Sequence, residues 1–71
     1  MTTDDLMRAT FSPGRAPRSP EYMAGCRALL DLRAAGKRDG LHCPWPEGSV
    51  QSDAWFAGAA EGIIVWREAA Q

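Results

Sequence analysis

The segment from Lys37 to Ser49 constrains the fold of this chain more than any other, because it separates two helical patterns. Its centre is the run Cys43-Pro44-Trp45-Pro46. Each proline forces extended or turn geometry on the residue before it, so a helix cannot continue through this run. A connector of this length needs an anchor. We expect Trp45 to pack between the flanking elements, with Cys43 as a second anchor.

The first predicted helix spans Pro20 to Ala35. Ser19 can cap the free amide groups at its start, and proline is well tolerated at the first helical position. Gly36 is a natural end, since glycine readily adopts the left-handed conformation that closes helices. Between these signals an apolar stripe recurs at helical spacing; it consists of Tyr22, Cys26, Leu29 and Leu30.

The second predicted helix begins at Ser49 or Ser52, either of which can act as the cap. Its apolar stripe consists of Trp55, Ala59, Ile63, Trp66 and Ala70. Gly58 and Gly62 lie one turn apart and form a ridge of small residues. Such a ridge lets another backbone approach closely.

The run from Ile63 to Trp66 is compatible with a helix or with a strand, because periodicity does not settle short apolar runs. A lone strand has no evident partner in this chain. The helix is therefore the favoured interpretation.

Residues 1–18 are predicted to form a disordered arm. Ser12-Pro13-Gly14 and Ala16-Pro17 interrupt regular structure, and a single turn from Asp4 to Ala9 is the alternative. We therefore divide the chain into a flexible arm, residues 1–18, and a helical domain, residues 19–71.

The predicted fold class is all-α: two antiparallel helices joined by the long Cys-Pro-Trp connector, with the disordered arm in front. The expected core consists of Tyr22, Cys26, Leu29, Leu30, Trp45, Trp55, Ile63 and Trp66. A chain this short buries only about 60% of its unfolded surface, so its core is marginal. Small domains of this kind usually gain stability from a disulfide, a metal or a partner.

The sequence predicts a cytoplasmic protein without membrane contact. The first five residues are partly acidic, unlike a signal peptide. No run approaches the roughly 18 apolar residues of a membrane span. In the reducing cytosol Cys26 and Cys43 are expected to be free thiols, and a disulfide between them is the alternative.

Catalytic and metal-binding motifs have little support. Zinc requires four ligands at recognisable spacing, which Cys26, His42 and Cys43 do not provide. A nucleophile would need a base beside it, and His42, the only histidine, is expected to be a partly exposed loop residue. We therefore predict no enzyme, no catalytic residue, no metal and no cofactor.

Basic residues are concentrated in the first half of the chain. Seven of the eight Lys and Arg residues lie between Arg8 and Arg38. Basic groups bind phosphates, and aromatic rings stack on unpaired bases. The candidate RNA- or phosphate-binding residues are Arg15, Arg18, Arg27, Arg33, Lys37 and Arg38, with Tyr22 and Trp45 as stacking rings. The alternative is a set of solvated charges with both aromatic rings in the core.

Four sequence features lie between Tyr22 and Gly58: Tyr22-x-x-Gly25, Ala35-Gly36, Cys43-Pro44-Trp45 and Trp55-x-x-Gly58. With them the chain resembles ribosome modulation factor, a family of small bacterial stationary-phase proteins. Trp66-Arg67-Glu68-Ala69 also echoes a Trp-Arg-Glu-Ala segment of that family. The resemblance covers half of the chain, and the Cys-Pro-aromatic loop paired with Trp-x-x-Gly is its most specific part.

The resemblance implies a two-helix fold and binding to the small ribosomal subunit near the 3′ end of 16S rRNA. In the family this binding silences translation and pairs ribosomes as inactive dimers. The chain would then be a non-catalytic ribosome- or RNA-binding modulator. The alternative is a protein-interaction module, a homodimer in the simplest case, whose surface would consist of Gly58, Gly62, Ile64 and Val65.

Overall fold

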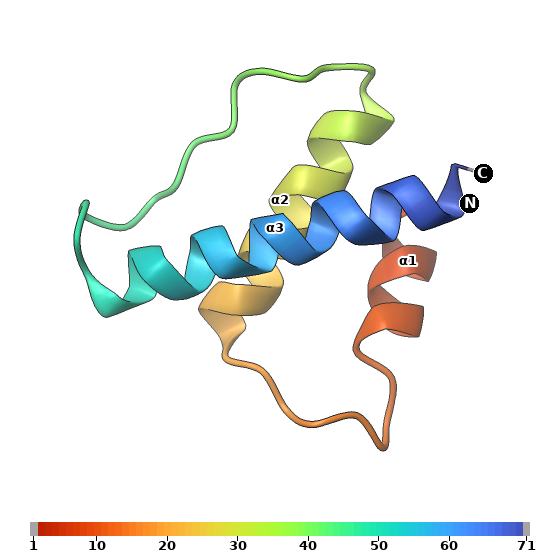
Figure 1. Ribbon diagram of the computed structural model, residues 1–71, viewed down its shortest axis with the longest axis horizontal. Coiled ribbons are helices and arrows are strands. Elements are labelled where there is room, and N and C mark those ends of the chain that lie inside the picture. The colour runs from red at the N-terminus through yellow and green to blue at the C-terminus, as the bar shows by residue number, and fades with distance from the viewer. Residues whose placement is uncertain (1, 71) are drawn as a thin grey trace.

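Three helices form the part of the chain that the computed structural model describes, residues 2–70, and this part contains no strand (Figure 1). The helices are α1 (Thr3–Thr10), α2 (Pro20–Ala34) and α3 (Val50–Ala69). α3 lies across α2, and α1 packs beside both of them. The predicted all-α class is confirmed, but residues 2–70 form three helices where the sequence predicted two.

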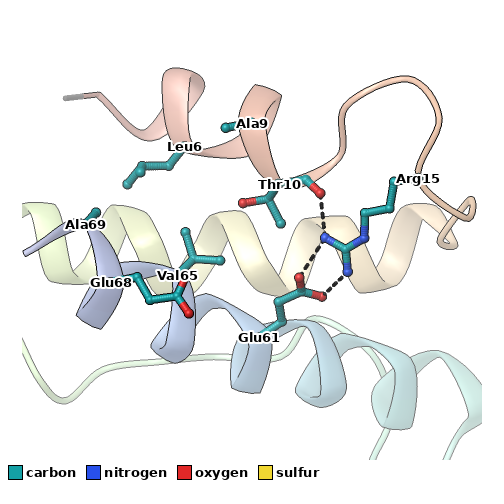
Figure 2. Close-up of a pocket in the computed structure, with 8 residues that line it drawn as sticks. All are labelled: Leu6, Ala9, Thr10, Arg15, Glu61, Val65, Glu68 and Ala69. Atoms are coloured by element: carbon teal, nitrogen blue, oxygen red, sulfur yellow. Dashed lines mark hydrogen bonds and ion pairs between the residues drawn. The ribbon is translucent and has the colours of Figure 1, made fainter.

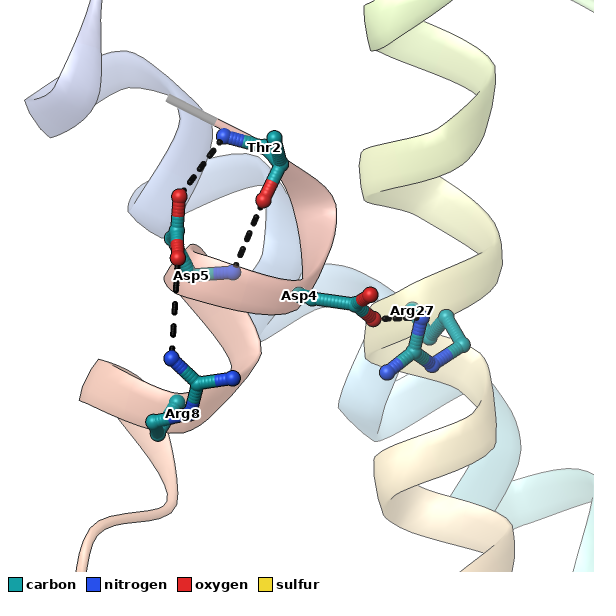
Figure 3. A network of polar contacts seen from close by, with 5 residues as sticks. All are labelled: Thr2, Asp4, Asp5, Arg8 and Arg27. Carbon is teal, nitrogen blue, oxygen red and sulfur yellow. Dashed lines mark hydrogen bonds and ion pairs between the residues drawn. The ribbon is translucent and has the colours of Figure 1, made fainter.

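The helix α1 lies within the segment that the sequence predicted to be disordered, so that prediction is wrong for residues 3–10. The hydroxyl of Thr2 accepts from the amide of Asp5, and the carboxylate of Asp5 accepts from the amide of Thr2 (Figure 3). This reciprocal cap satisfies two amide groups that a helix start leaves free. Leu6 is buried, so tertiary packing supplies the stability that eight residues alone lack.

The bounds of α2 match the prediction to within one residue. The Ser19 hydroxyl accepts from the amide of Tyr22, as expected of a cap. At the other end Gly36 adopts a φ of 77°, and the amides of Gly36 and Lys37 donate back to the carbonyls of Arg33 and Leu32. This is the glycine-based closure that the sequence indicated.

The helix α3 begins after Ser49, whose hydroxyl accepts from the amide of Ser52. Of the two serines considered as caps, Ser49 has the role, and Ser52 is buried inside the first turn. The run from Ile63 to Trp66 is helical, which confirms the favoured interpretation.

The helices α2 and α3 cross rather than run antiparallel, and their backbones touch at the crossing (Figure 1). A Cβ atom on Gly25 would overlap the carbonyl of Trp55, and one on Gly58 would overlap the carbonyl of Tyr22. At Gly62 a Cβ would lie 3.0 Å from the carbonyl oxygen of Cys26. Glycine at these positions therefore sets how closely the two helices approach.

Two buried clusters flank the crossing. The first consists of Leu6, Cys26 and Leu30, with Met7, Phe11, Val65 and Trp66 packed against it. The second consists of Leu29, Trp55 and Ala59, with Ala28, Leu41, Cys43 and Ile63 packed against it. Among the predicted core residues, Tyr22, Ile63 and Trp66 are partly buried.

The connector between α2 and α3 is anchored differently from the prediction. Trp45 is 40% exposed and belongs to neither cluster, so the prediction that it packs between the helices is wrong. Leu41 and Cys43 pack against the second cluster instead, and the thiol of Cys43 donates to the Ser52 hydroxyl at 3.7 Å. Pro44 and Pro46 hold Trp45 in a bend that lies outside this contact.

Candidate anion-binding groove

The six cations predicted to bind phosphate fall into two groups in the structure. Three of them contact groups on neighbouring elements: Arg15, Arg18 and Arg27. The other three gather beside the end of α2: Arg33, Lys37 and Arg38. The structure therefore does not place them on one continuous surface.

Arg15 is held by Glu61 of α3. Its Nη2 donates to Glu61 Oε1 at 2.8 Å, and its Nη1 lies 2.7 Å from Glu61 Oε2 (Figure 2). Arg15 also donates to the carbonyl of Thr10, which fastens the loop after α1 to α3. Because its charge is matched by Glu61, Arg15 supports the fold rather than a phosphate site.

The Tyr22 hydroxyl donates to the same carboxylate at 2.5 Å. The hydrogen bond from Arg15, followed by the one from Tyr22, holds the pKa of Glu61 below its ordinary value. The bond to Glu61 also raises the pKa of Tyr22, since ionisation would remove the proton that bridges the two oxygens. These shifts describe a neutralised structural cluster.

Figure 2 also shows the open space between α1 and α3 that this cluster borders, with a volume of about 450 Å³. Leu6, Ala9, Val65 and Ala69 line much of it. Arg15 is the one cation among the described residues that line it, and it is already paired with Glu61. This space offers no unmatched charge of the kind that would select an anion.

Arg27 and Arg18 also have partners. The Nη1 of Arg27 lies 2.8 Å from a carboxylate oxygen of Asp4 and links α2 to α1 (Figure 3). The guanidinium of Arg18 lies 4.6 Å from the centre of the Tyr22 ring, and the Phe11 ring meets Tyr22 edge-on at 6.2 Å. Tyr22 is therefore occupied on two sides and is not placed to stack on a base.

The other three cations line a groove between the end of α2 and the second half of α3. Its volume is about 280 Å³. The lining residues are Arg33, Gly36, Lys37, Arg38, Ile63, Trp66 and Arg67. Four positively charged side chains thus share one concave site, with Trp66 and Ile63 as its apolar wall.

The turn after α2 positions these cations. Gly36 reverses the chain, and Arg33 Nη1 then donates to the carbonyls of Lys37 and Arg38 at 3.3 and 3.4 Å. These bonds hold the turn against the last turn of α2. Arg67 comes from α3 and completes the site from the opposite side.

Within residues 2–70, no carboxylate forms an ion pair with any of the four groove cations. Lys37, Arg38 and Arg67 are exposed, and Arg33 is partly buried. Guanidinium groups bind phosphate and carboxylate oxygens in a bidentate manner, and a lysine adds a compact charge. The groove can therefore bind an anionic group, with an apolar surface beside it.

Sequence reasoning missed Arg67 and assigned Trp66 only to the core. Arg67 is the single cation in the acidic second half, so composition argued against a role for it. Its spacing from Ile63, one helical turn earlier, was the available signal. That spacing shows which face of the helix Arg67 occupies, but it does not show that this face lies opposite the turn after α2.

The predicted partner surface is divided by the fold. Gly58 and Gly62 are buried against α2 of the same chain, so they are not available to a partner as predicted. Val65 packs against the first cluster. Ile64 is 56% exposed and is the one member of the set that faces solvent.

The described residues contain no group of three or more His, Cys, Asp or Glu side chains that could hold a metal. Cys26 is buried and Cys43 partly buried, and both are free thiols. No helix within residues 2–70 is sufficiently long and apolar to cross a membrane.

Comparison with known proteins finds no family model, no curated protein and no solved structure that matches this chain.

Proposed function

We propose that this protein is a non-catalytic RNA-binding module that holds phosphates in the groove of Arg33, Lys37, Arg38 and Arg67. The observation that carries the proposal is the gathering of these four cations without a carboxylate partner among residues 2–70. Ribosomal RNA of the small subunit is the target that the resemblance to ribosome modulation factor suggests. The protein would act there as a modulator of translation.

The electrostatics favour local contact over long-range attraction. The chain has a net charge of −1, so the groove must act against the field of the rest of the molecule. Each phosphate bound releases condensed counterions, and for single strands the logarithm of the affinity falls by about 0.7 per phosphate per logarithm of salt. Four contacts would lower the affinity roughly 50-fold between about 50 and 200 mM salt.

Trp66 would supply the part of the interface that does not depend on charge. Its side chain lines the groove and is partly buried. An aromatic side chain can pack against an unpaired base or a sugar. Trp45 is exposed but does not line this groove, so we assign no stacking role to it here.

The test is co-sedimentation with small ribosomal subunits and titration of a labelled single-stranded RNA, using the double variant Lys37→Gln with Arg38→Gln. We expect both kinds of binding to weaken and the salt slope to fall by about 1.4, because two phosphate contacts are lost. The matched control is Arg8→Gln with Arg18→Gln, which removes the same charge outside the groove.

Three results would contradict the proposal: no binding at low salt, equal weakening by both double variants, or binding that ignores salt. Saturation near one copy per subunit at physiological salt would support the ribosomal target. Equal affinity for any single-stranded RNA would keep the binding module but remove the ribosomal assignment.

A further inference from the structure

The face of α3 opposite its glycine ridge carries a self-complementary pattern. Gly58 and Gly62 face α2. Because each helical residue turns roughly 100°, Ala60 lies on the far side. Four further residues lie within roughly 40° of Ala60 around the axis; they are Asp53, Phe56, Ile64 and Arg67.

Ala60 and these four residues form a seam along the outer face of α3. All five are exposed, and Phe56 and Ile64 are 52% and 56% exposed despite their apolar side chains. In Figure 1, α3 lies across α2, and no other helix of the described part of the chain covers its outer side. The pattern is symmetric in position and opposite in charge. An acidic residue, Asp53, lies as far before Ala60 as the basic Arg67 lies after it, and Phe56 and Ile64 are likewise equidistant.

We propose that a second copy of this chain packs on this seam, with the two α3 helices antiparallel and Ala60 at the two-fold axis. In that arrangement Asp53 lies opposite the partner's Arg67, and Phe56 lies opposite the partner's Ile64. The small Ala60 at the centre allows the two helices to approach closely. Every contact is made twice, as a two-fold interface requires.

Charge complementarity favours a second copy of the chain as the partner and an antiparallel orientation of the two α3 helices. A parallel pair would set Asp53 against the partner's Asp53 and Arg67 against the partner's Arg67, which is repulsive. The antiparallel pair converts both repulsions into attractions. An unrelated partner would need no such symmetry about Ala60, whereas a second copy does.

The seam is short, so the dimer is expected to be weak and reversible. From Asp53 to Arg67 it extends about 21 Å along the helix. One helix face per protomer falls at the low end of specific interface sizes, where dissociation constants in the micromolar to millimolar range are usual. Association would still stabilise so small a domain, and this stabilisation would grow with the logarithm of the protein concentration above the dissociation constant.

The test is sedimentation equilibrium of the full chain from tens of micromolar to about 1 mM. We expect the mass of the wild-type protein to rise from that of the 7.7 kDa monomer toward twice that value. Asp53→Arg alone and Arg67→Asp alone should each stay monomeric. An equimolar mixture of the two variants should associate, because each then meets the opposite charge at both ends.

Asp31→Arg is the matched control, since it makes the same charge change on the exposed side of α2 and should associate like the wild type. Circular dichroism checks that each variant folds. A wild-type monomer at all concentrations would overturn the proposal. Association of both single variants, or a mixture that associates no better than they do, would also overturn it. RNA binding is not a readout here, because Arg67 also lines the groove.

Discussion

The crossing of α2 and α3 and the docking of α1 are two different ways to join helices. At the crossing, the backbone of Gly25 contacts the backbone of Trp55, and Gly58 contacts Tyr22 in the same manner. By contrast, α1 attaches through side chains, with Leu6 buried and Asp4 paired with Arg27.

The difference teaches where this chain tolerates change. Backbone atoms cannot adopt another rotamer, so an added methyl group at Gly25 or Gly58 could be accommodated only by moving one helix away from the other. Side-chain contacts and exposed ion pairs can be repacked or lost at moderate cost. A disruptive substitution at the crossing should therefore destabilise the whole fold. One in α1 should instead undock that helix and leave the crossing intact.

The largest loss of stability is expected for Gly58→Ala. Its Cβ would overlap the Tyr22 carbonyl, so α3 would have to move away from α2. We expect a loss of at least about 3 kcal/mol in the free energy of unfolding, measured by urea denaturation, which a domain this small can barely sustain.

Gly62→Ala is the matched control on the same ridge. Its Cβ would lie 3.0 Å from the Cys26 carbonyl oxygen and 3.1 Å from Leu29 Cβ, contacts that a small shift relieves. The gain in helix propensity of about 1 kcal/mol offsets much of that strain. Equal stability of the two variants would show that the backbone contact at Gly58 does not limit the crossing.

The second-largest loss of stability is expected for Leu6→Ala. Removing a buried leucine side chain usually costs about 2–5 kcal/mol, here taken mainly from the docking of α1. Burial raises the pKa of Cys26 to about 11, so its thiol should alkylate slowly in the native protein. In the variant, Cys26 should alkylate faster, as mass spectrometry of its peptide would show.

Arg8→Ala is the control for this experiment, since Arg8 lies on the same helix but its side chain is 78% exposed. It should leave alkylation of Cys26 unchanged. If Leu6→Ala instead abolished the helical circular dichroism signal altogether, α1 and the crossing would be one cooperative unit and the comparison would be wrong.

The smallest effect is expected for Glu61→Gln, which weakens the attachment of Arg15 to α3. Because hydrogen bonds lower the pKa of Glu61 in the folded state, the ionised carboxylate stabilises the fold at pH values above the ordinary carboxylate pKa. That contribution is lost as the pH falls through the lowered value. The difference in melting temperature between wild type and variant should be largest near pH 7 and should shrink as the pH falls below the ordinary carboxylate range. A difference that persists in acid would contradict the role of the carboxylate charge.

The helix bounds near the connector could be predicted because their signals are local. Ser19, Gly36 and Ser49 each act on the backbone within a few residues of their own position. The helix α1 entered the prediction only as the alternative of a single turn from Asp4 to Ala9, although Thr2 and Asp5 carry a capping signal. Its formation depends on burial of Leu6 against Cys26 and Leu30, which no local pattern reveals.

The candidate site was predictable to the same extent, because only the cations that lie close together in the sequence could be grouped. Lys37 and Arg38 adjoin the end of α2, so sequence placed them together with Arg33. The pairing of Arg15 with Glu61 and the arrival of Arg67 at the groove both depend on how α3 crosses α2. The ridge at Gly58 was correctly interpreted as a place for backbone approach, but the backbone that fills it belongs to the same chain.

The glycine crossing also bears on how the chain folds. The contacts of Gly25 and Gly58 require both helices to be present and in register, since a shift of one residue would bring a side chain into the gap. We therefore expect the crossing to form in a single concerted step that contains the folding nucleus. The docking of α1 would follow as a separate and faster equilibrium, opening and closing many times during the life of one folded molecule.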